Sequence, residues 1–310
     1  MLFIISTLLP VFGLIFLGWL LRTSQRLGEQ AASELNRFVV WLCLPSLLFH
    51  AMATAAMEDI WNPGFVTAFT LSTLLIYGLT LLWRVKQHGL AVASLDALSA
   101  SYANTGYVGI PLCLFVLGDA GLAPALVSSL VVVSVLFAIA VIGVEISTQK
   151  GKSVWQAALK VTLALLKNPL VVAPFLGVGW NLAGWPLPHI AADFLQLIGD
   201  ATVPAALVSL GAFLAHKQPG AGQGAWPLVF IKLIIHPLLT WVLAYHVFAL
   251  DPLWAAAAVL LAALPTGTGP YMLAEFYRQE ASVVSRTILF STLASVLTLA
   301  AILLWLPQAS

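Results

Sequence analysis

The stretch "ASYANTGYVGIPL", residues 100–112, interrupts an apolar run with two glycines, an asparagine and a proline. Proline lacks the backbone N–H that a helix uses, and its ring clashes with the preceding turn. Glycine permits dihedral angles that other residues avoid. A helix that enters this stretch is therefore expected to break between Asn104 and Pro111.

The composition around this break is that of an integral membrane protein. Of the 310 residues, 61% are hydrophobic and 8% are charged, and the mean hydropathy is +1.00. Apolar runs of about 20 residues recur, each long enough to cross a hydrocarbon core of roughly 30 Å. They lack the polar–apolar alternation of barrel strands. We expect an all-α membrane protein with ten transmembrane helices, at 2–21, 35–56, 64–83, 93–117, 121–146, 168–184, 190–214, 226–249, 253–277 and 282–306.

The basic residues predict the orientation of these spans in the lipid bilayer. When the loops are assigned alternately to the two sides, all thirteen Lys and Arg fall on one side, including Arg84 and Lys232. The acidic residues Glu58, Asp59, Asp119, Asp193 and Asp251 fall on the other. The positive-inside rule then places the basic side in the cytoplasm and both termini outside a bacterial inner membrane. This charge asymmetry reflects membrane insertion, so no nucleic-acid partner is expected.

A constant offset indicates an internal repeat. Adding 159 to a residue number moves Pro10 onto Pro169, Gly18 onto Gly177, Pro45 onto Pro204 and Pro111 onto Pro270. Two copies of a five-helix unit, 1–150 and 168–310, explain these matches, with 151–167 as an amphipathic cytoplasmic connector. A repeat with an odd number of spans enters the membrane in opposite senses, which gives the inverted topology of many secondary transporters.

The repeat places a second break in the ninth span. The stretch around Asn104 to Pro111 falls on "LPTGTGPY", residues 264–271, which also carries two prolines and two glycines. Unwound backbone inside a membrane must be enclosed by protein or line a wet cavity, so paired breaks predict a binding site near the bilayer midplane. Prolines and glycines that only kink or pack helices are the alternative. The predicted substrate-binding residues are Asn104, Thr105, Gly106, Tyr107, Gly109, Pro111, Pro265, Thr266, Gly267, Thr268, Gly269 and Pro270.

The chemistry expected at this site is anion binding. Half-helices that begin near Gly109–Pro111 and Gly269–Pro270 would present free amides and partial positive charge, so a carboxylate would not need a buried lysine. The side-chain amide of Asn104 and the hydroxyls of Thr105, Thr266 and Thr268 would add donors. Neither break contains a carboxylate, and buried acids are scarce in the chain.

Four stretches of the chain resemble the auxin efflux carrier family of bacteria and plants. They are "LPVFGLIFLGWLLR", "LNRFVVWLCLPSLLF", "SYANTGYVGIPL" and "LPTGTGPYMLAEFY", at 9–22, 35–49, 101–112 and 264–277. The resemblance implies secondary transport of small organic anions such as carboxylates, substrate contact by Asn104, and helices 4 and 9 crossing at Pro111 and Pro270. This is the architecture of bile-acid symporters and sodium/proton antiporters. It also implies a homodimer-forming scaffold, 1–57 and 168–215, and a moving transport part, 62–148 and 223–306.

Four further ionisable residues lie inside predicted spans and are candidates for coupling. They are Asp200, His50, Glu275 and Glu145. Structural hydrogen bonds, or pairing of Glu275 with Arg278 and of Glu145 with Lys150, are the alternatives. His236 is interpreted as a packed histidine.

Enzyme signatures and cofactor-binding motifs are not found. No metal-ligand spacing of His and carboxylates and no Gly-x-Ser-x-Gly elbow occurs, and no lysine follows the "GTG" at 267–269. We therefore expect neither an enzyme nor a cofactor or metal site. The function expected is efflux of a small organic anion by alternating access. A sodium-coupled symporter of the bile-acid type, or a receptor that binds an anion without moving it, remain as alternatives.

Overall fold

The computed structural model describes residues 2–54, 61–148, 163, 166–215 and 224–305. Every regular element among these residues is a helix. Ala103 and Thr266 form an isolated antiparallel β-bridge. Most of the predicted connector 151–167 lies outside the described residues, as do Glu58 and Asp59. The chain is therefore all-helical over the described ranges, as its composition predicts.

The chain forms two compact units, each built from separate stretches of sequence. Unit 1 comprises Met1–Trp61, Gly106–Leu112 and Ala164–Lys217, and unit 2 comprises Asn62–Thr105, Cys113–Leu163 and Gln218–Ser310. Both units draw on the first and the second half of the chain. Each unit is described below by itself.

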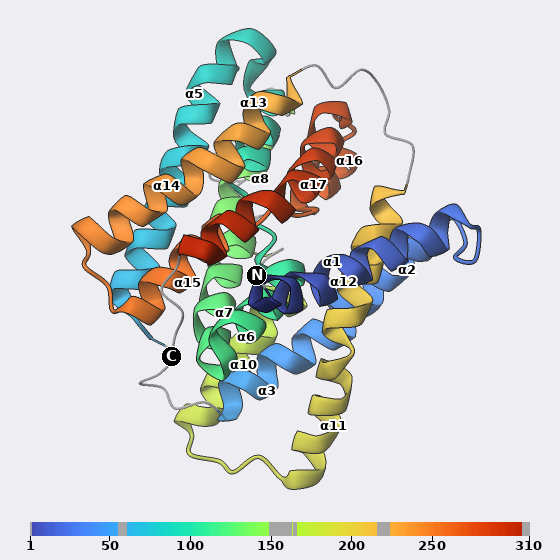
Figure 1. The fold of residues 1–310 in the computed structure, drawn as a ribbon, viewed down its shortest axis with the longest axis vertical. Coiled ribbons are helices and arrows are strands. Elements are labelled where there is room, and N and C mark those ends of the chain that lie inside the picture. Colours follow the sequence, from blue (N-terminus) through green and yellow to red (C-terminus); the bar gives the residue numbers. More distant parts are fainter. Residues whose placement is uncertain (1, 55–60, 149–162, 164–165, 216–223, 306–310) are drawn as a thin grey trace. The chain divides into compact units, whose positions relative to one another are not determined.

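Unit 1 is built from two pairs of packed helices. Its helices are α1 (Leu2–Thr23), α2 (Ala31–Phe38), η1 (Val39–Cys43), α3 (Leu44–Thr54), α10 (Pro169–Leu182), α11 (His189–Asp200) and α12 (Thr202–Leu214). Helix α1 packs along α12, and α3 packs along α10 (Figure 1). In each pair the two helices come into close contact at a glycine. A larger residue at that position would force the backbone of the partner helix to move. A Cβ on Gly18 would lie 2.2 Å from the carbonyl oxygen of Val208, and one on Gly177 would lie 2.6 Å from that of Phe49.

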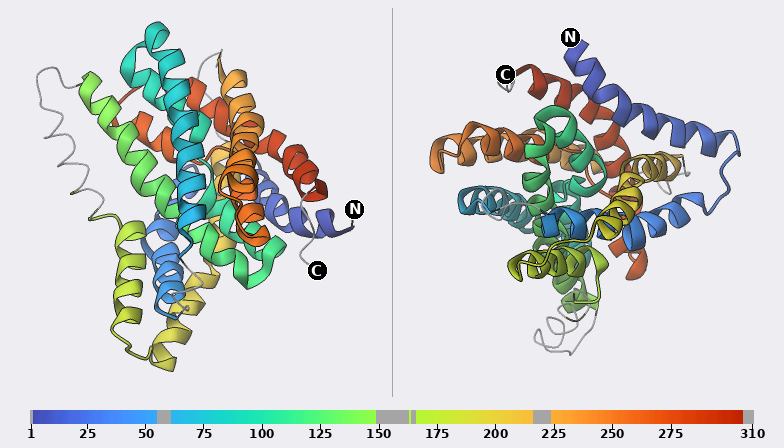
Figure 2. Two further views of the ribbon diagram at one scale, coloured as in Figure 1. Left: turned by 90° about the vertical axis from the view of Figure 1, so that its left-hand side faces the viewer. Right: turned by 90° about the horizontal axis from the view of Figure 1, so that it is seen from below.

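Unit 2 is organised around the long helix α5 (Pro63–Ser101), which packs along α8 (Figures 1 and 2). Gly89, with a φ of +73°, joins the two straight parts of α5. The unit also contains η3 (Gly118–Gly121), α7 (Leu122–Leu130), η4 (Val131–Leu136), α8 (Phe137–Thr148), α13 (Ala225–Phe230), η5 (Ile231–Ile235), α14 (His236–Trp241), η6 (Val242–Val247), α15 (Pro252–Ala262), α16 (Gly269–Phe276) and α17 (Ser282–Trp305). The π-helix η2 (Thr105–Gly109) and α6 (Ile110–Leu117) include residues of both units.

An Asn-Pro pair starts one long helix in each unit. The Oδ1 atom of Asn62 accepts a hydrogen bond of 2.9 Å from the amide of Phe65, and the next residue, Pro63, begins α5. Asn168 accepts from Leu170 in the same manner, and Pro169 begins α10. Asparagine satisfies an amide that the first turn leaves open, and proline suits the first helical position.

Six helical segments are long and apolar enough to cross a membrane. They are Ala31–Thr54, Pro63–Ser101, Thr105–Thr148, His189–Leu214, Ala225–Val247 and Ser282–Trp305. Three shorter apolar helices are Leu8–Thr23, Pro169–Leu182 and Pro252–Ala262. Pro63–Ser101 and Thr105–Thr148, with 39 and 44 residues, are about twice the length that one crossing needs. The chain is thus a multi-pass membrane protein, while the count of ten crossings and the inverted repeat stay predictions.

Candidate functional site

Two non-helical stretches of unit 2 pair with each other by backbone hydrogen bonds. Helix α5 ends at Ser101, and α15 ends at Ala262. Beyond these ends, the amide of Asn104 donates to the carbonyl oxygen of Pro265 at 2.9 Å. The amide of Gly267 donates to the carbonyl oxygen of Tyr102 at 3.0 Å. The pairing satisfies backbone groups that have left their helices, which an apolar interior requires.

Thr266 anchors this pairing to two neighbouring helices. Its side chain is fully buried, and its Oγ1 atom donates to the carbonyl oxygen of Ser99 in α5 at 2.8 Å. Its amide donates to the Oγ atom of Ser291 in α17 at 3.0 Å. The hydroxyl proton of Thr266 is thus used inside the protein here, and a role for Thr266 as an anion donor stays a prediction.

The ring of Tyr102 explains the two glycines of the second stretch. A Cβ added to Gly267 would lie 2.9 Å from the Cε1 atom of Tyr102, and a Cβ on Gly269 would lie 2.6 Å from its Cζ atom. Real Cβ atoms do not approach other heavy atoms so closely. Both glycines are thus required because the aromatic ring occupies the space where their side chains would stand.

The helix after the first stretch begins earlier than the sequence predicts. Helical hydrogen bonding resumes at Thr105, where the π-helix η2 leads directly into α6. The α-helix α6 itself starts at Ile110, within the expected Gly109–Pro111, but the five residues before it are π-helical and not open. In the second stretch, α16 does begin at Gly269, whose amide has no acceptor within its own helix.

The remaining predicted donors of unit 2 cluster at the same pairing. Asn104 is 5% exposed and Thr105 is 2% exposed, so both are buried beside the bridge. Thr268 is half-buried and immediately precedes α16. Within the described part of the chain, no hydrogen bond is recorded for the hydroxyls of Thr105 and Thr268. These groups, with the Gly269 amide and the side chain of Asn104, form a set of neutral donors. We call this set, Asn104, Thr105, Thr268 and Gly269, the donor cluster.

The other predicted residues of the first stretch belong to unit 1. These are Gly106, Tyr107, Gly109 and Pro111. The hydroxyl of Tyr107 donates to the Oδ1 atom of Asn36 in α2, so the tyrosine is engaged within its own unit. The roles of these four residues in substrate binding stay predictions.

A family model described as "Membrane transport protein" matches residues 3–303 of the chain. The chain belongs to the auxin efflux carrier family of membrane transporters. Similar proteins include the "Putative malonate transporter" of Rhizobium meliloti, 28% identical over 97% of this chain and 95% of that protein. An "Uncharacterized transporter" of Methanothermobacter thermautotrophicus is 29% identical over 95% of each chain. "Auxin efflux carrier component 8" of Arabidopsis thaliana is 28% identical over 50% of this chain and 44% of its own.

Two of the carrier's predicted coupling residues accept hydrogen bonds from tyrosines. Glu145 is buried, and its Oε1 atom accepts from the hydroxyl of Tyr277 at 2.7 Å. The exposed Glu275 accepts from Tyr271 at 2.6 Å. The expected ion pair of Glu275 with Arg278 is not found among the described residues, and Lys150 lies outside them.

The other two coupling candidates lie in unit 1 and do not pair. Asp200 is exposed at the end of α11, and His50 is half-buried in α3. No hydrogen bond or ion pair between their side chains is recorded in the described ranges. A coupling role for these two residues stays a prediction.

The carrier buries three charged residues that sequence reasoning missed. Asp96 is 1% exposed in α5, and its Oδ2 atom lies 2.7 Å from the Nε atom of the buried Arg84. Lys232 is 0% exposed in η5, and its Nζ atom donates to the carbonyl oxygen of Ala262 at 2.6 Å. Both basic residues were assigned to loop flanks. Lys232 thus contacts Ala262, which ends α15 shortly before the second non-helical stretch, while an anion site that needs no lysine stays a prediction.

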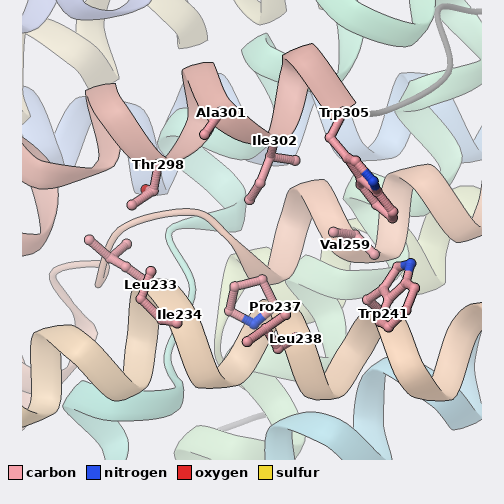
Figure 3. Close-up of a pocket in the computed structure, with 10 residues that line it drawn as sticks. All are labelled: Leu233, Ile234, Pro237, Leu238, Trp241, Val259, Thr298, Ala301, Ile302 and Trp305. Carbon is pink, nitrogen blue, oxygen red and sulfur yellow. The ribbon is translucent and has the colours of Figure 1, made fainter.

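Unit 2 contains an apolar cavity, and none of the residues that line it belongs to the donor cluster. Its volume is about 440 Å³, and Figure 3 shows Leu233, Pro237 and Val259 facing Thr298 and Ile302, with Trp241 and Trp305 at one end. None of the predicted binding residues lines it. A cavity with so few hydrogen-bond donors does not suit a carboxylate.

Proposed function

We propose that this carrier is a secondary active transporter that moves a small carboxylate outward across a bacterial inner membrane by alternating access. The observation that carries the proposal is the pairing of residues 102–104 with 265–267 between apolar helices, with the donor cluster beside it. Backbone of this kind is tolerated inside a membrane only where it is enclosed or lines a cavity, and it is typical of transporter binding sites.

The chemistry of the cluster favours an anion. Asn104, Thr105 and Thr268 supply side-chain N–H and O–H groups, and Gly269 supplies an amide at the positive end of α16. The cluster contains no carboxylate, which a cation would prefer. A relative named for malonate supports a dicarboxylate as the first substrate to test.

The packing of unit 1 supports an inverted repeat. The offset of 159 residues moves Gly18 onto Gly177 and Phe49 onto Val208. The close contact of Gly18 with Val208 is thus the counterpart of the contact of Gly177 with Phe49, with the two halves of the chain exchanged. A two-fold relation between the repeats produces this exchange. The same offset relates both ends of α6 (Ile110–Leu117) and α16 (Gly269–Phe276).

In this proposal the scaffold is unit 1 without Gly106–Leu112, and the transport part is unit 2 together with that segment. Their boundaries support this division, because Met1–Trp61 and Ala164–Lys217 cover the scaffold stretches implied by the family. The scaffold would form the homodimer. Unit 2 carries the donor cluster, so the bound anion would move with it while the outer and inner openings alternate.

Flux through purified carrier in liposomes tests the proposal. The liposomes are loaded with labelled malonate, and efflux is followed with and without sodium and an imposed membrane potential, against liposomes without protein. We expect malonate efflux that is insensitive to sodium and driven by the anion gradient and potential, or by protons. A strict sodium requirement would favour the bile-acid type of symporter. Binding without flux would favour the receptor.

A further inference from the structure

Lys232 is a buried cation held at the edge of the second non-helical stretch. It lies two turns into the continuous helix Ala225–Val247, its side chain is fully buried, and no carboxylate pairs with it among the described residues. Its recorded hydrogen bond is to the carbonyl oxygen of Ala262 at 2.6 Å. An ammonium without a counter-charge is costly in an apolar interior, so a residue of this kind is a candidate for function.

The contact with Ala262 replaces a hydrogen bond that the helix has lost. In an uninterrupted α-helix, the carbonyl oxygen of Ala262 would accept from the amide of Thr266, four residues later. Here the Nζ atom of Lys232 takes the carbonyl, and the Oγ atom of Ser291 takes the amide at 3.0 Å. Lys232 and Ser291 thus satisfy the two groups that the break separates. A cation also suits the negative end of α15.

We propose that Lys232 is a positioning residue whose charge, together with the proposed site at the donor cluster, sets the affinity for anions of higher charge. The bound anion would supply the counter-charge that the protein does not provide. The ammonium acts on the anion electrostatically and without touching it, since its contact is with Ala262, the last residue of α15, and not with the donor cluster itself. This inference rests on the proposed function.

Two substitutions and two probe anions distinguish the effect of the charge of Lys232 from the effect of its hydrogen bond. Lys232→Gln keeps an N–H donor for Ala262 and removes the charge, whereas Lys232→Met removes both. The probes are malonate, which has two negative charges near neutral pH, and malonamate, which has the same skeleton and one charge. Lys86→Met removes a charge from an exposed position of α5 and is the matched control.

Equilibrium binding to purified, monodisperse protein measures the effect, and thermal unfolding checks that each variant is folded. We expect both Lys232 variants to bind malonate about tenfold more weakly and malonamate about threefold more weakly, because the electrostatic energy is proportional to the charge of the ligand. Lys86→Met should bind both probes as the parent does. The charged variant Lys232→Arg should retain the preference for malonate.

Two outcomes would overturn the inference and are distinguishable. If Lys232→Gln binds malonate as well as the parent, or if both probes weaken equally, Lys232 only caps a carbonyl and the proposed function stands. If Asn104→Ala in the same assay binds malonate as the parent does, the donor cluster is not the site. The role assigned to Lys232 then falls with it.

Discussion

The amide nitrogen of Asn104 lies 2.9 Å from the carbonyl oxygen of Pro265, which joins the two non-helical stretches of unit 2. This bond fixes the backbone of the residue to which substrate contact is assigned. Around it, Tyr102 packs on Gly267 and Gly269, and Thr266 is tied to α5 and α17. The donor cluster is therefore held by interactions that single substitutions can test.

Gly269→Ala should destabilise the carrier and weaken anion binding. The new methyl group would lie 2.6 Å from the Cζ atom of Tyr102, so the ring must move, and overpacking of this kind costs about 1 to 3 kcal/mol. Gly78→Ala is the matched control because a Cβ there meets nothing within 4 Å. Thermal unfolding in detergent and malonate binding measure both effects. Equal behaviour of the two variants would show that Tyr102 does not fill this space.

Gly18→Ala and Gly177→Ala should destabilise unit 1 to a similar degree. In both, the added methyl group meets a backbone carbonyl that cannot rotate away, at 2.2 Å from Val208 and 2.6 Å from Phe49. We expect a loss of about 1 to 3 kcal/mol for each. Gly13→Ala, on the same helix as Gly18 with open space around it, serves as the control. A loss of stability at only one of the two glycines would contradict the proposal that their contacts are counterparts in the two halves of the chain.

Asp96→Asn should be among the most destabilising single changes in unit 2. It leaves the buried guanidinium of Arg84 without its counter-charge, and removal of one partner from a buried pair typically costs about 3 to 5 kcal/mol. Asp251→Asn, at an exposed position, is the control. Thermal unfolding of the purified variants provides the comparison. A variant as stable as the parent would mean that the pair is reached by solvent.

Cysteine labelling tests the orientation in the membrane. The native thiols of Cys43 and Cys113 are fully buried and are replaced by alanine in the background protein. We expect Asp119→Cys to react with an impermeant maleimide in intact cells. Lys86→Cys should react only after the membrane is opened, because the positive-inside rule places it in the cytoplasm. The reverse pattern would reject the assigned orientation.

Much of the helical framework is predictable from the sequence, because hydropathy and Asn-Pro or Gly-Pro pairs are local signals. The start of α16 at Gly269 and the starts of α5 and α10 at Pro63 and Pro169 are examples. The π-helix at Thr105–Gly109 was missed because one extra residue per turn leaves no mark in an apolar sequence. It extends the helical segment back from Ile110, the start of α6, to Thr105.

The buried charges were missed for a different reason. Lys232 and Arg84 lie near the ends of apolar runs, where proximity to a loop is the default reading of a basic residue. Only the three-dimensional structure brings Lys232 to Ala262 and Arg84 to Asp96. The available signal was Asp96 itself, an acid within an apolar span, which calls for a buried partner. The packing of Tyr102 on two glycines had no such signal, since it depends on the pairing of distant segments.

The most direct test of the account is malonate binding and flux by Asn104→Ala. We expect Asn104→Ala to fold normally and to lose about 1 to 3 kcal/mol of binding free energy, because a charged carboxylate loses one donor. Asn168→Ala removes an asparagine that caps α10 and should bind as the parent does. Binding and efflux by folded Asn104→Ala equal to those of the parent would contradict the placement of the anion beside Asn104.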